Sequence, residues 1–498
     1  MKVLLVEPPK PKWSLMGDYV APPIGLAYIA SSAEKAGHEV EIIDCNALNI
    51  NQNRLRELIK RKSPDVVGVS AYTPSYPIAL KTLRIAKEEL PKVKTVMGGP
   101  HPTFLFREVL QNREVDFVVI GEGEIPFTNL LNALEKGKPL KEVENIAFRA
   151  GNDVVRTKLG KPVDPDSLPL PAYHLLPMEK YRFPVFNKFS IVISSRGCPF
   201  NCAFCSEHVF WRKWRVRTPE KVVDEIELLV KKYSVESIWF GDDCFNASRF
   251  HVERICDEVI ERELKVKWYY QGRADFIVDQ KDLLPKTREA GNIMVQIGIE
   301  SHTNEELEKL DKKLTVDQVR KAVKLLKENN ILCQGLIIIG TWDDSYDSIM
   351  QKVKYVKKLD VDFPIFTIFT PFPGTKIYEE AIRSGQISFK DPANHDEYVQ
   401  IIEQLEAGNL ELLALFMLGA ITAAITAFYA FRIVGLVFHG EPSEHVKELV
   451  AKGHEIHEAP KVMLAPLMVL AAVTIALGPV NFALKLLGSD VIDSVVSP

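Results

Sequence analysis

The chain has 498 residues, a length that predicts several folding units. Apolar residues make up 46% of it and charged residues 26%, which excludes a wholly disordered protein. The formal net charge is −4, so the composition gives no overall basic field and we expect no nucleic-acid partner. Seven cysteines are too few for a disulfide framework, and three of them crowd together at 198–205, which favours metal chemistry.

Short apolar strands alternate with helical stretches in the first part of the chain. This alternation predicts a doubly wound parallel sheet over residues 1–150. Ligands of such sheets lie at the carboxyl ends of the strands, where small residues recur here. A proline-rich segment at 151–186 predicts a stiff linker. The expected strands are 2–6, 39–44, 65–70, 94–98 and 116–120.

The same alternation restarts after the linker. Six strand–helix units fall short of the eight of a closed barrel, so we expect a partial (β/α)6 barrel over 187–375. Its functional groups should follow the carboxyl ends of the strands. A connector is expected at 376–409. The expected strands are 189–194, 237–240, 267–271, 293–299, 333–339 and 363–369.

The last part of the chain has a different composition. Residues 412–431 and 462–484 carry no charge, and each stretch is long enough to cross a hydrocarbon core of about 30 Å as a helix. We therefore predict a two-helix transmembrane tail over 410–498. Basic residues in the loop between the spans favour a cytoplasmic loop. The first 400 residues would then lie outside, whereas their clustered cysteines favour a reducing compartment. We expect a membrane-anchored protein with these domains in the cytoplasm, and a tail acquired by fusion.

The sequence Cys198-Pro-Phe-Asn-Cys202-Ala-Phe-Cys205 is the sharpest motif, and it follows the first predicted strand of the barrel. Three thiolates on one short loop can hold an iron–sulfur cluster. Because a fourth local cysteine is missing, one iron would stay open to a small molecule. The alternatives are a zinc site completed by His208, or three unrelated core thiols.

This triplet, with Phe204 before its last cysteine, resembles the signature of radical S-adenosylmethionine enzymes. The resemblance implies a 4Fe–4S cluster on Cys198, Cys202 and Cys205, which binds S-adenosylmethionine and cleaves it to a 5′-deoxyadenosyl radical. It also implies an external one-electron donor of the flavodoxin or ferredoxin type. The residues implied to contact S-adenosylmethionine are Phe204, Asp242, Asp243, Gly298 and Glu300. For the three acidic residues among them, capping of strand ends is the alternative.

Residues 22–26, 98–101 and 121–124 resemble the cobalamin-binding domain of one large radical-enzyme subfamily. That subfamily includes methylases of unactivated carbon and the anaerobic cyclase of bacteriochlorophyll synthesis. The Asp-x-His-x-x-Gly motif that ligates cobalt in the classical cobalamin fold is absent, so the resemblance implies cobalamin without a protein histidine. For one of the implied residues, His101, a role in stabilising a turn is the alternative. The implied cobalamin contacts are Ser70, Thr73, Gly98, Gly99, His101, Gly121, Glu122 and Gly123.

Residues 410–488 resemble the last spans of the antiporter-like large subunit of NADH–quinone oxidoreductase. Taken alone, this tail would suggest a membrane-transport or respiratory-complex subunit.

The two resemblances over about residues 1–400 imply a cobalamin-dependent radical enzyme. We expect it to transfer a methyl group to an unactivated carbon of a small-molecule or lipid substrate. A radical cyclase or oxidative rearrangement is the second possibility. The basic and aromatic run at 211–217 is expected to be a solvated loop beside the site, and Cys244 is expected to pack in the core.

Overall fold

The computed structural model describes residues 1–9, 20–183 and 188–385. The chain divides into two compact units, Met1–Leu413 and Ala414–Pro498, and the second unit lies entirely outside the described residues. The architecture below therefore belongs to the first unit.

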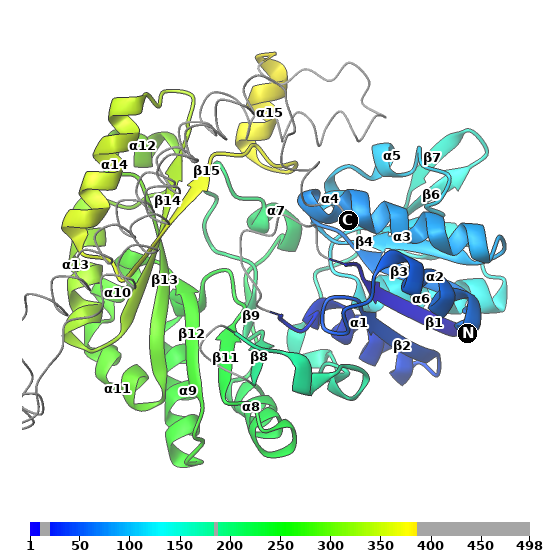
Figure 1. The fold of residues 1–498 in the computed structure, drawn as a ribbon, viewed down its shortest axis with the longest axis horizontal. Coiled ribbons are helices and arrows are strands. Elements are labelled where there is room, and N and C mark those ends of the chain that lie inside the picture. The colour runs from blue at the N-terminus through cyan, green and yellow to red at the C-terminus, as the bar shows by residue number, and fades with distance from the viewer. Residues whose placement is uncertain (10–19, 184–187, 386–498) are drawn as a thin grey trace, which may run out of the picture. The chain divides into compact units, whose positions relative to one another are not determined.

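The first sheet has seven strands in the order β2-β1-β3-β4-β5-β6-β7 (Figure 1). Its first five strands run parallel, which confirms the expected doubly wound sheet. The bounds are β1 Lys2–Glu7, β2 Glu39–Asp44, β3 Val66–Ser70, β4 Lys94–Gly98 and β5 Phe117–Val119.

Helices cover both faces of this sheet, because successive side chains of a strand point to opposite faces. Val3 and Leu5 of β1 pack with α1 and α6, whereas Leu4 and Val6 pack with α2 and α3. The bounds are α1 Ile24–Lys35, α2 Gln52–Lys62, α3 Tyr76–Glu89, α4 Pro100–Phe104, α5 Phe106–Val109 and α6 Glu124–Lys136.

The sheet continues past the boundary that we expected at residue 150. The strands β6 (Ile146–Ala150) and β7 (Asp153–Arg156) form an antiparallel hairpin at its edge, and β6 pairs antiparallel with β5. The sequence pattern missed this hairpin because both strands are short and no helix separates them. The linker then follows the surface of the first domain: Ala172 N donates to the Ala27 carbonyl at 3.0 Å.

The second sheet has six parallel strands in the order β15-β14-β13-β12-β11-β8. Within the described residues its edge strands β8 and β15 do not pair, which agrees with the expected open, partial barrel. A two-stranded antiparallel ribbon, β9 Ser195–Arg196 with β10 Arg215–Val216, follows β8. The bounds are β8 Phe189–Val192, β11 Ser237–Phe240, β12 Lys267–Gly272, β13 Asn292–Glu300, β14 Leu332–Ile339 and β15 Phe363–Ile368.

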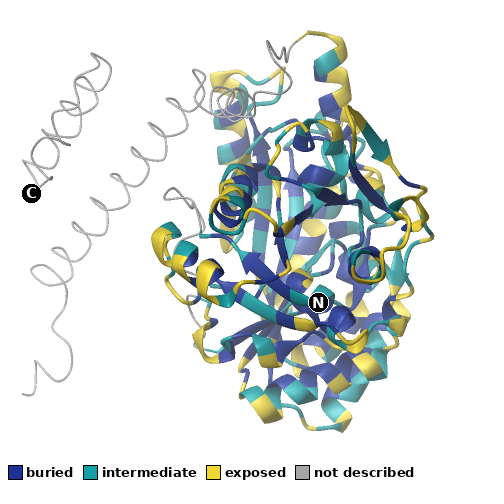
Figure 2. Ribbon diagram, turned by 90° about the vertical axis from the view of Figure 1, so that its right-hand side faces the viewer, coloured by how far each residue is buried: buried dark blue, intermediate teal, exposed yellow. Residues whose placement is uncertain are grey.

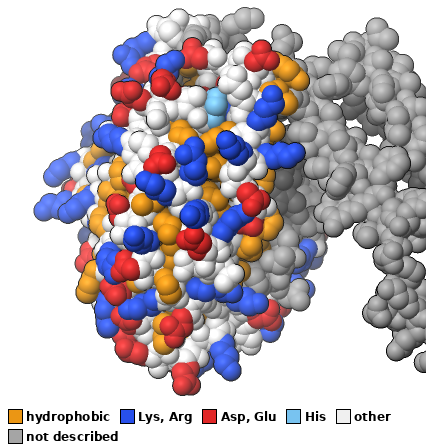
Figure 3. All heavy atoms as spheres, turned by 90° about the vertical axis from the view of Figure 1, so that its left-hand side faces the viewer, with side chains coloured by type: hydrophobic (Ala, Val, Ile, Leu, Met, Phe, Trp, Pro, Cys, Tyr) orange, Lys and Arg blue, Asp and Glu red, His pale blue; other side chains and the backbone are white. Residues whose placement is uncertain are grey.

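Helices pack on the outer face of this sheet and bury its largest apolar core. Figure 2 shows the buried strands inside and exposed positions on the outer helices. Acidic and basic side chains intermix over the face seen in Figure 3. The bounds are α7 Glu207–Trp211, α8 Pro219–Tyr233, α9 Arg249–Glu261, α10 Ala274–Asp279, α11 Leu284–Glu289, α12 Asn304–Lys309, α13 Val316–Glu328, α14 Tyr346–Leu359 and α15 Lys376–Arg383.

Among the described residues, no helix is long and apolar enough to cross a bilayer. The two predicted spans, 412–431 and 462–484, and the connector from residue 386 onward lie outside those residues. An uncharged stretch of sufficient length shows only that a helix could cross a membrane.

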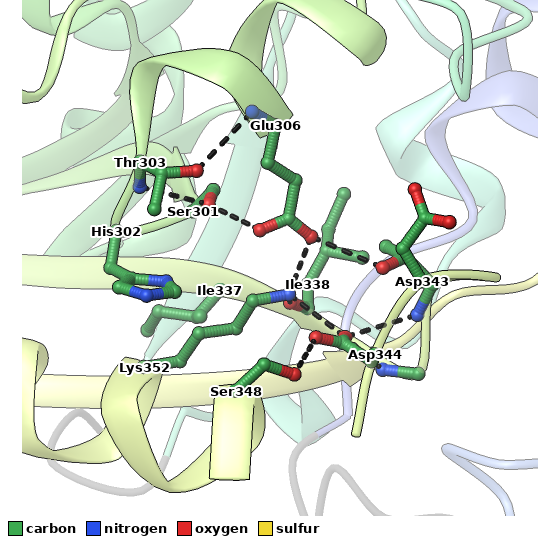
Figure 4. Close-up of polar contacts among 12 residues, drawn as sticks. Ser301, His302, Thr303, Glu306, Ile337, Ile338, Asp343, Asp344, Ser348 and Lys352 are labelled. Carbon is green, nitrogen blue, oxygen red and sulfur yellow. Dashed lines mark hydrogen bonds and ion pairs between the residues drawn. The ribbon is translucent and has the colours of Figure 1, made fainter. Parts of the chain in front are cut away.

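The fully buried Lys352 of α14 ties together three segments at the carboxyl end of β14 (Figure 4). Its Nζ donates to Glu306 Oε1 at 2.6 Å, to Asp344 Oδ2 at 2.8 Å and to the Ile338 carbonyl at 3.0 Å. Glu306 also accepts a hydrogen bond from Ser301, which follows β13. Since an unpaired buried charge is very costly, this network fixes α12 and the loop after β14 to the sheet.

Replacing Lys352 with Met should destabilise the chain, because Glu306 and Asp344 would stay buried without their cation. We expect the free energy of unfolding to fall by about 3–5 kcal/mol, measured by guanidinium denaturation of the full chain. Lys354→Met, at an exposed position of the same helix, is the matched control and should have an effect within about 0.5 kcal/mol. Equal losses in the two variants would contradict the role of the network.

The same network should make the fold sensitive to acid. Burial alone raises the pKa of Asp344, but hydrogen bonds from Lys352 and Ser348 outweigh it and hold the pKa below its usual range. The resulting stabilisation is complete above the unfolded pKa and is lost as the pH falls through the folded pKa. When the pH is lowered from neutral to about 3, the free energy of unfolding should therefore fall less in Asp344→Asn than in the wild type. Denaturation curves at a series of pH values test this, and parallel curves would refute it.

Candidate active site

The three motif cysteines lie on the loop between β9 and α7, at the carboxyl end of β8. A hydrogen bond from Cys205 N to the Cys202 carbonyl at 3.1 Å folds this cysteine loop on itself. Ala203 N donates to the Leu310 carbonyl at 2.9 Å, and Ile377 N donates to the Ala203 carbonyl at 3.2 Å. The segment after α12 and the start of α15 therefore hold the middle of the loop.

All three thiols are free of disulfide bonds. A hydrogen bond with Cys244 lowers the pKa of Cys198 to about 7, although burial opposes the shift. Burial raises the pKa of Cys205 to about 12 and also raises that of Cys202. Because thiolates are the metal ligands, binding a metal cluster must release these protons, and the affinity should fall in acid.

The donor set fits a 4Fe–4S cluster better than a single ion. Within the described ranges, no group of three Cys, His, Asp or Glu side chains lies close enough to hold one metal ion. Thiolates that bind a cluster ligate different irons, so they stand farther apart than the ligands of one ion. Arg273 and Lys312 add positive charge near Cys198, which favours its thiolate.

The two aspartates after β11 face different surroundings. Asp242 is 1% exposed and accepts hydrogen bonds from Ser194 N at 3.1 Å and Ser194 Oγ at 2.8 Å. Burial raises its pKa to about 6. Asp242 thus connects β11 to the end of β8, which agrees with the alternative role of capping a strand end. Asp243 instead lines the cavity described below, together with Glu207, and is the aspartate that can reach a bound molecule.

Phe204, Gly298 and Glu300 come together around Lys312. Lys312 Nζ donates to Glu300 Oε1 at 2.6 Å and lies 5.6 Å from the centre of the Phe204 ring. Burial alone lowers the pKa of Lys312, but Glu300 and Cys202 outweigh it and raise the pKa. A Cβ on Gly298 would lie 2.1 Å from Glu300 Oε1, so the ion pair requires glycine there. Sequence reasoning missed Lys312, which belongs to no motif.

A cavity of about 570 Å³ opens between the carboxyl edges of the two sheets. This volume is within the usual range of small-molecule and cofactor clefts. Among the described residues that line it there is no histidine, and small residues let a flat ring approach the backbone. The wall thus fits cobalamin without a protein histidine ligand. Most of the residues expected to contact cobalamin are in the wall, namely Ser70, Gly98, Gly99, Gly121, Glu122 and Gly123.

Thr73 and His101 are buried and are not among the residues that line the cavity. His101 Nδ1 lies 3.2 Å from Thr73 Oγ1, and the His101 ring stacks on Tyr76 with ring centres 4.2 Å apart. These contacts join the loop after β4 to the loop after β3. They agree with the alternative role of His101 in stabilising a turn.

Arg196, just before the cysteine motif, connects the cysteine loop to the first domain. Its guanidinium donates to Glu122 Oε1 at 2.9 Å and to Glu124 Oε1 at 2.6 Å. The rings of Tyr28 and Trp211 flank it, with their centres at 5.2 and 5.4 Å. The Glu122 and Glu124 side chains therefore bind Arg196, while the glycines between and before them line the cavity.

The run at 211–217 is only partly the solvated loop that we expected: Arg212, Lys213 and Val216 are exposed and Trp211 lines the cavity, but Arg215 and Arg217 are engaged in ion pairs. Arg215 donates to Glu122 Oε2 at 2.9 Å, and Arg217 forms an ion pair with the fully buried Glu225 of α8. Arg215 thus connects the two domains, and Arg217 also does so by donating to Tyr28 Oη of α1 at 3.3 Å. One signal of the contact with Glu122 was present in the sequence: the glutamates at 122 and 124 have no basic residue close by in the chain. The sequence could not show which distant arginines pair with them.

Two family profiles match the chain. One is described as the B12 binding domain and covers residues 17–131, and the other is the Radical SAM superfamily over residues 192–353. An uncharacterised methyltransferase of Pyrococcus horikoshii is 36% identical, across 77% of this chain and 84% of the relative. The anaerobic magnesium-protoporphyrin IX monomethyl ester cyclase of Rubrivivax gelatinosus is 34% identical, across 76% of this chain and 70% of the cyclase.

A solved structure shares the fold. The radical S-adenosylmethionine methyltransferase TsrM from Kitasatospora setae, with cobalamin and a [4Fe-4S] cluster bound, matches with a TM-score of 0.63. The match covers 77% of this chain and 74% of TsrM at 19% sequence identity, so it concerns the fold.

These matches correct two predictions about the tail. The resemblance of residues 410–488 to an NADH–quinone oxidoreductase subunit gains no support, because the family matches end at residue 353. The predicted localisation, a membrane-anchored enzyme with cytoplasmic catalytic domains, is wrong: the described residues contain no membrane-spanning helix, and the relatives are named as methyltransferases and cyclases.

The prediction for the first 400 residues is confirmed at the level of family and cofactors. The cysteine loop and the glycine-lined cavity lie within the two matched regions. With 36% identity to one relative over most of both chains, this chain belongs to the radical S-adenosylmethionine enzymes that carry a B12-binding domain, whose cofactors are a 4Fe–4S cluster, S-adenosylmethionine and cobalamin.

Proposed function

We propose that this enzyme transfers a methyl group to an unactivated carbon of a small molecule. The observation that carries the proposal is the single cavity between the two sheets. One wall consists of the glycine loops of the B12-binding domain, and the opposite wall includes Arg196, Glu207 and Asp243 beside the cysteine loop. A substrate in this cavity would be within reach of both cofactor sites. The methyltransferase relative from Pyrococcus supports the proposal.

The residues of the site divide into those that would hold the cluster and those that would bind or position S-adenosylmethionine. Bound together, the cluster and S-adenosylmethionine supply one-electron radical chemistry, and cobalamin supplies a methyl carrier. Cys198, Cys202 and Cys205 would hold the cluster. Asp242 would act as a positioning residue through Ser194, whereas the groups that would contact S-adenosylmethionine are Phe204, Asp243, Gly298, Glu300 and Lys312.

Asp243 and Glu207 present two carboxyl groups to the cavity. Burial raises the pKa of both, and the charge of Glu207 raises that of Asp243 further. Each group therefore holds its proton to a higher pH than an ordinary carboxyl does. In the protonated form, Asp243 Oδ or Glu207 Oε would donate a hydrogen bond to an acceptor in the cavity.

A radical cyclisation or oxidative rearrangement is the second candidate, because the Rubrivivax cyclase is 34% identical to the chain. Incubation with methyl-¹³C-labelled S-adenosylmethionine, an external one-electron donor of the flavodoxin or ferredoxin type and a metabolite extract separates the two. Methyl transfer puts the label into the product. Cyclisation gives an unlabelled product of altered mass.

Replacing Cys198, Cys202 and Cys205 with Ala should abolish cluster binding. Anaerobically purified wild type is expected to show a broad iron–sulfur absorption, and the triple variant should lose both this absorption and its iron, because no thiolate ligand remains. Cys333→Ala, a buried core position on β14, is the matched control and should keep its iron. Normal iron content in the triple variant would contradict the assignment.

Cobalamin should bind without a nitrogen ligand from a histidine of the protein, because no described residue that lines the cavity is a histidine. Paramagnetic resonance of the reduced cofactor should show no splitting from a histidine nitrogen. The spectrum should be the same in His101→Ala, whose imidazole lies against Thr73 and Tyr76. A histidine splitting that disappears in this variant would show that the cavity is misassigned.

A further inference from the structure

Three glutamines form a row across the inner face of the second sheet. Gln271 of β12 is directly opposite Gln296 of β13, and Gln296 is directly opposite Gln334 of β14. Neighbouring strands lie about 4.8 Å apart, so the row spans roughly 10 Å.

The side chains of this glutamine row point away from the outer helices. Their neighbours along the strands, Tyr270 and Val295, pack into the core beneath those helices. Successive residues of a strand face opposite sides, so the glutamines face the interior of the partial barrel. Gln271 also lines the cavity between the two sheets. The row therefore continues from the wall of that cavity into the barrel.

The three amides have no protein partner in the described part of the chain. All three side chains are half-buried, and none makes a hydrogen bond there. Nearby Trp239, which also lines the cavity, has a buried indole Nε1 without a partner. Buried polar groups are normally hydrogen-bonded. One buried indole N–H and three half-buried amides without a protein partner, all on one interior face, therefore point to a ligand.

The layers on either side of the row limit the chemistry of that ligand. Toward the amino ends of the strands lie Trp239, Tyr269 and Met294, in register with one another. The Trp239 and Tyr269 rings stack at 6.0 Å with an interplanar angle of 4°. Toward the carboxyl ends, the Lys312–Glu300 ion pair lies over Gly298. The amides thus lie between an apolar aromatic floor and a charge pair that is already satisfied.

We propose that Gln271, Gln296 and Gln334 recognise the substrate, and that its recognised part is uncharged and carries both hydrogen-bond donors and acceptors, as in hydroxyl or amide groups. This inference rests on the proposed methyl transfer and names its substrate class. Each amide accepts through Oε1 and donates through Nε2, which suits such groups.

Two other ligand classes fit this interior less well. A carboxylate or phosphate would need a cation, but Lys312 and Arg273 are engaged by Glu300 and Asp275. A hydrocarbon would leave the amides buried without partners, which is unfavourable. A neutral polar group avoids both costs.

The full chain, loaded with its cofactors, tests the inference with methyl-¹³C-labelled S-adenosylmethionine and a metabolite extract of the native cells. We expect the label in a water-soluble compound that carries neutral hydroxyl or amide groups, identified by mass spectrometry. Gln296→Leu and Gln334→Leu should each lower the labelled product by roughly tenfold while iron and cobalamin contents stay unchanged. Gln111→Leu, at an exposed position of the first domain, is the matched control and should label as the wild type does.

The outcomes separate this inference from the proposed function. A labelled product without any neutral hydroxyl or amide group, or full labelling by both glutamine variants, overturns the role of the row but keeps methyl transfer. Absence of any label with the wild type overturns methyl transfer instead.

A second measurement, on the same cofactor-loaded protein, tests the role of the glutamine row without catalytic turnover. Saturation-transfer NMR should detect N-acetylglycinamide, an uncharged probe with amide donors and acceptors. Binding should be roughly tenfold weaker in the Gln296→Leu, Gln334→Leu double variant. Equal signals in wild type and double variant, or preferential binding of acetate, overturn the assignment.

Discussion

The buried guanidinium of Arg196 is the interaction on which the arrangement of the site depends. It lies at the base of the cysteine loop, and its two carboxylate partners, Glu122 and Glu124, belong to a loop of the first domain that lines the cavity. Planar, charge-assisted contacts of this kind fix orientation as well as distance. Loss of either carboxylate would leave charge uncompensated in a buried place, so the relative position of the cysteine loop and the glycine-lined wall is strongly specified.

The same rule, a buried cation matched by acidic partners, recurs around the second sheet. Lys312 is paired with Glu300 above Gly298, and Lys352 is paired with Glu306 and Asp344 behind it. These pairs hold the ends of β13 and β14 and the segment that supports the cysteine loop. The two lysines are already paired with carboxylates, so the interior below them is left to neutral groups. This is why the unpartnered glutamine row stands out there.

The sequence predicted the features that depend on local pattern and missed those that depend on distant partners. Alternating strands and helices gave the two parallel sheets, and the spacing of Cys198, Cys202 and Cys205 gave the cluster site, because both signals lie within short windows. The Arg196–Glu122 contact joins residues 74 positions apart, and Lys312 follows no pattern. The glycine loops that we expect to contact cobalamin line the cavity, but only the folded chain shows that Thr73 and His101 do not. The apolar tail misled the prediction of localisation, because hydrophobicity alone does not define a membrane protein.

The hairpin of β6 and β7 at the edge of the first sheet has a consequence for the behaviour of the chain in concentrated solution. A parallel sheet that ended at β5 would expose unpaired backbone groups along a buried, apolar strand, an open template for the strands of other molecules. Instead the edge is β7, a strand of four residues that begins with Asp153 and ends with Arg156, both exposed. Short, charged edges resist further pairing, so this hairpin protects the B12-binding domain against aggregation through its sheet.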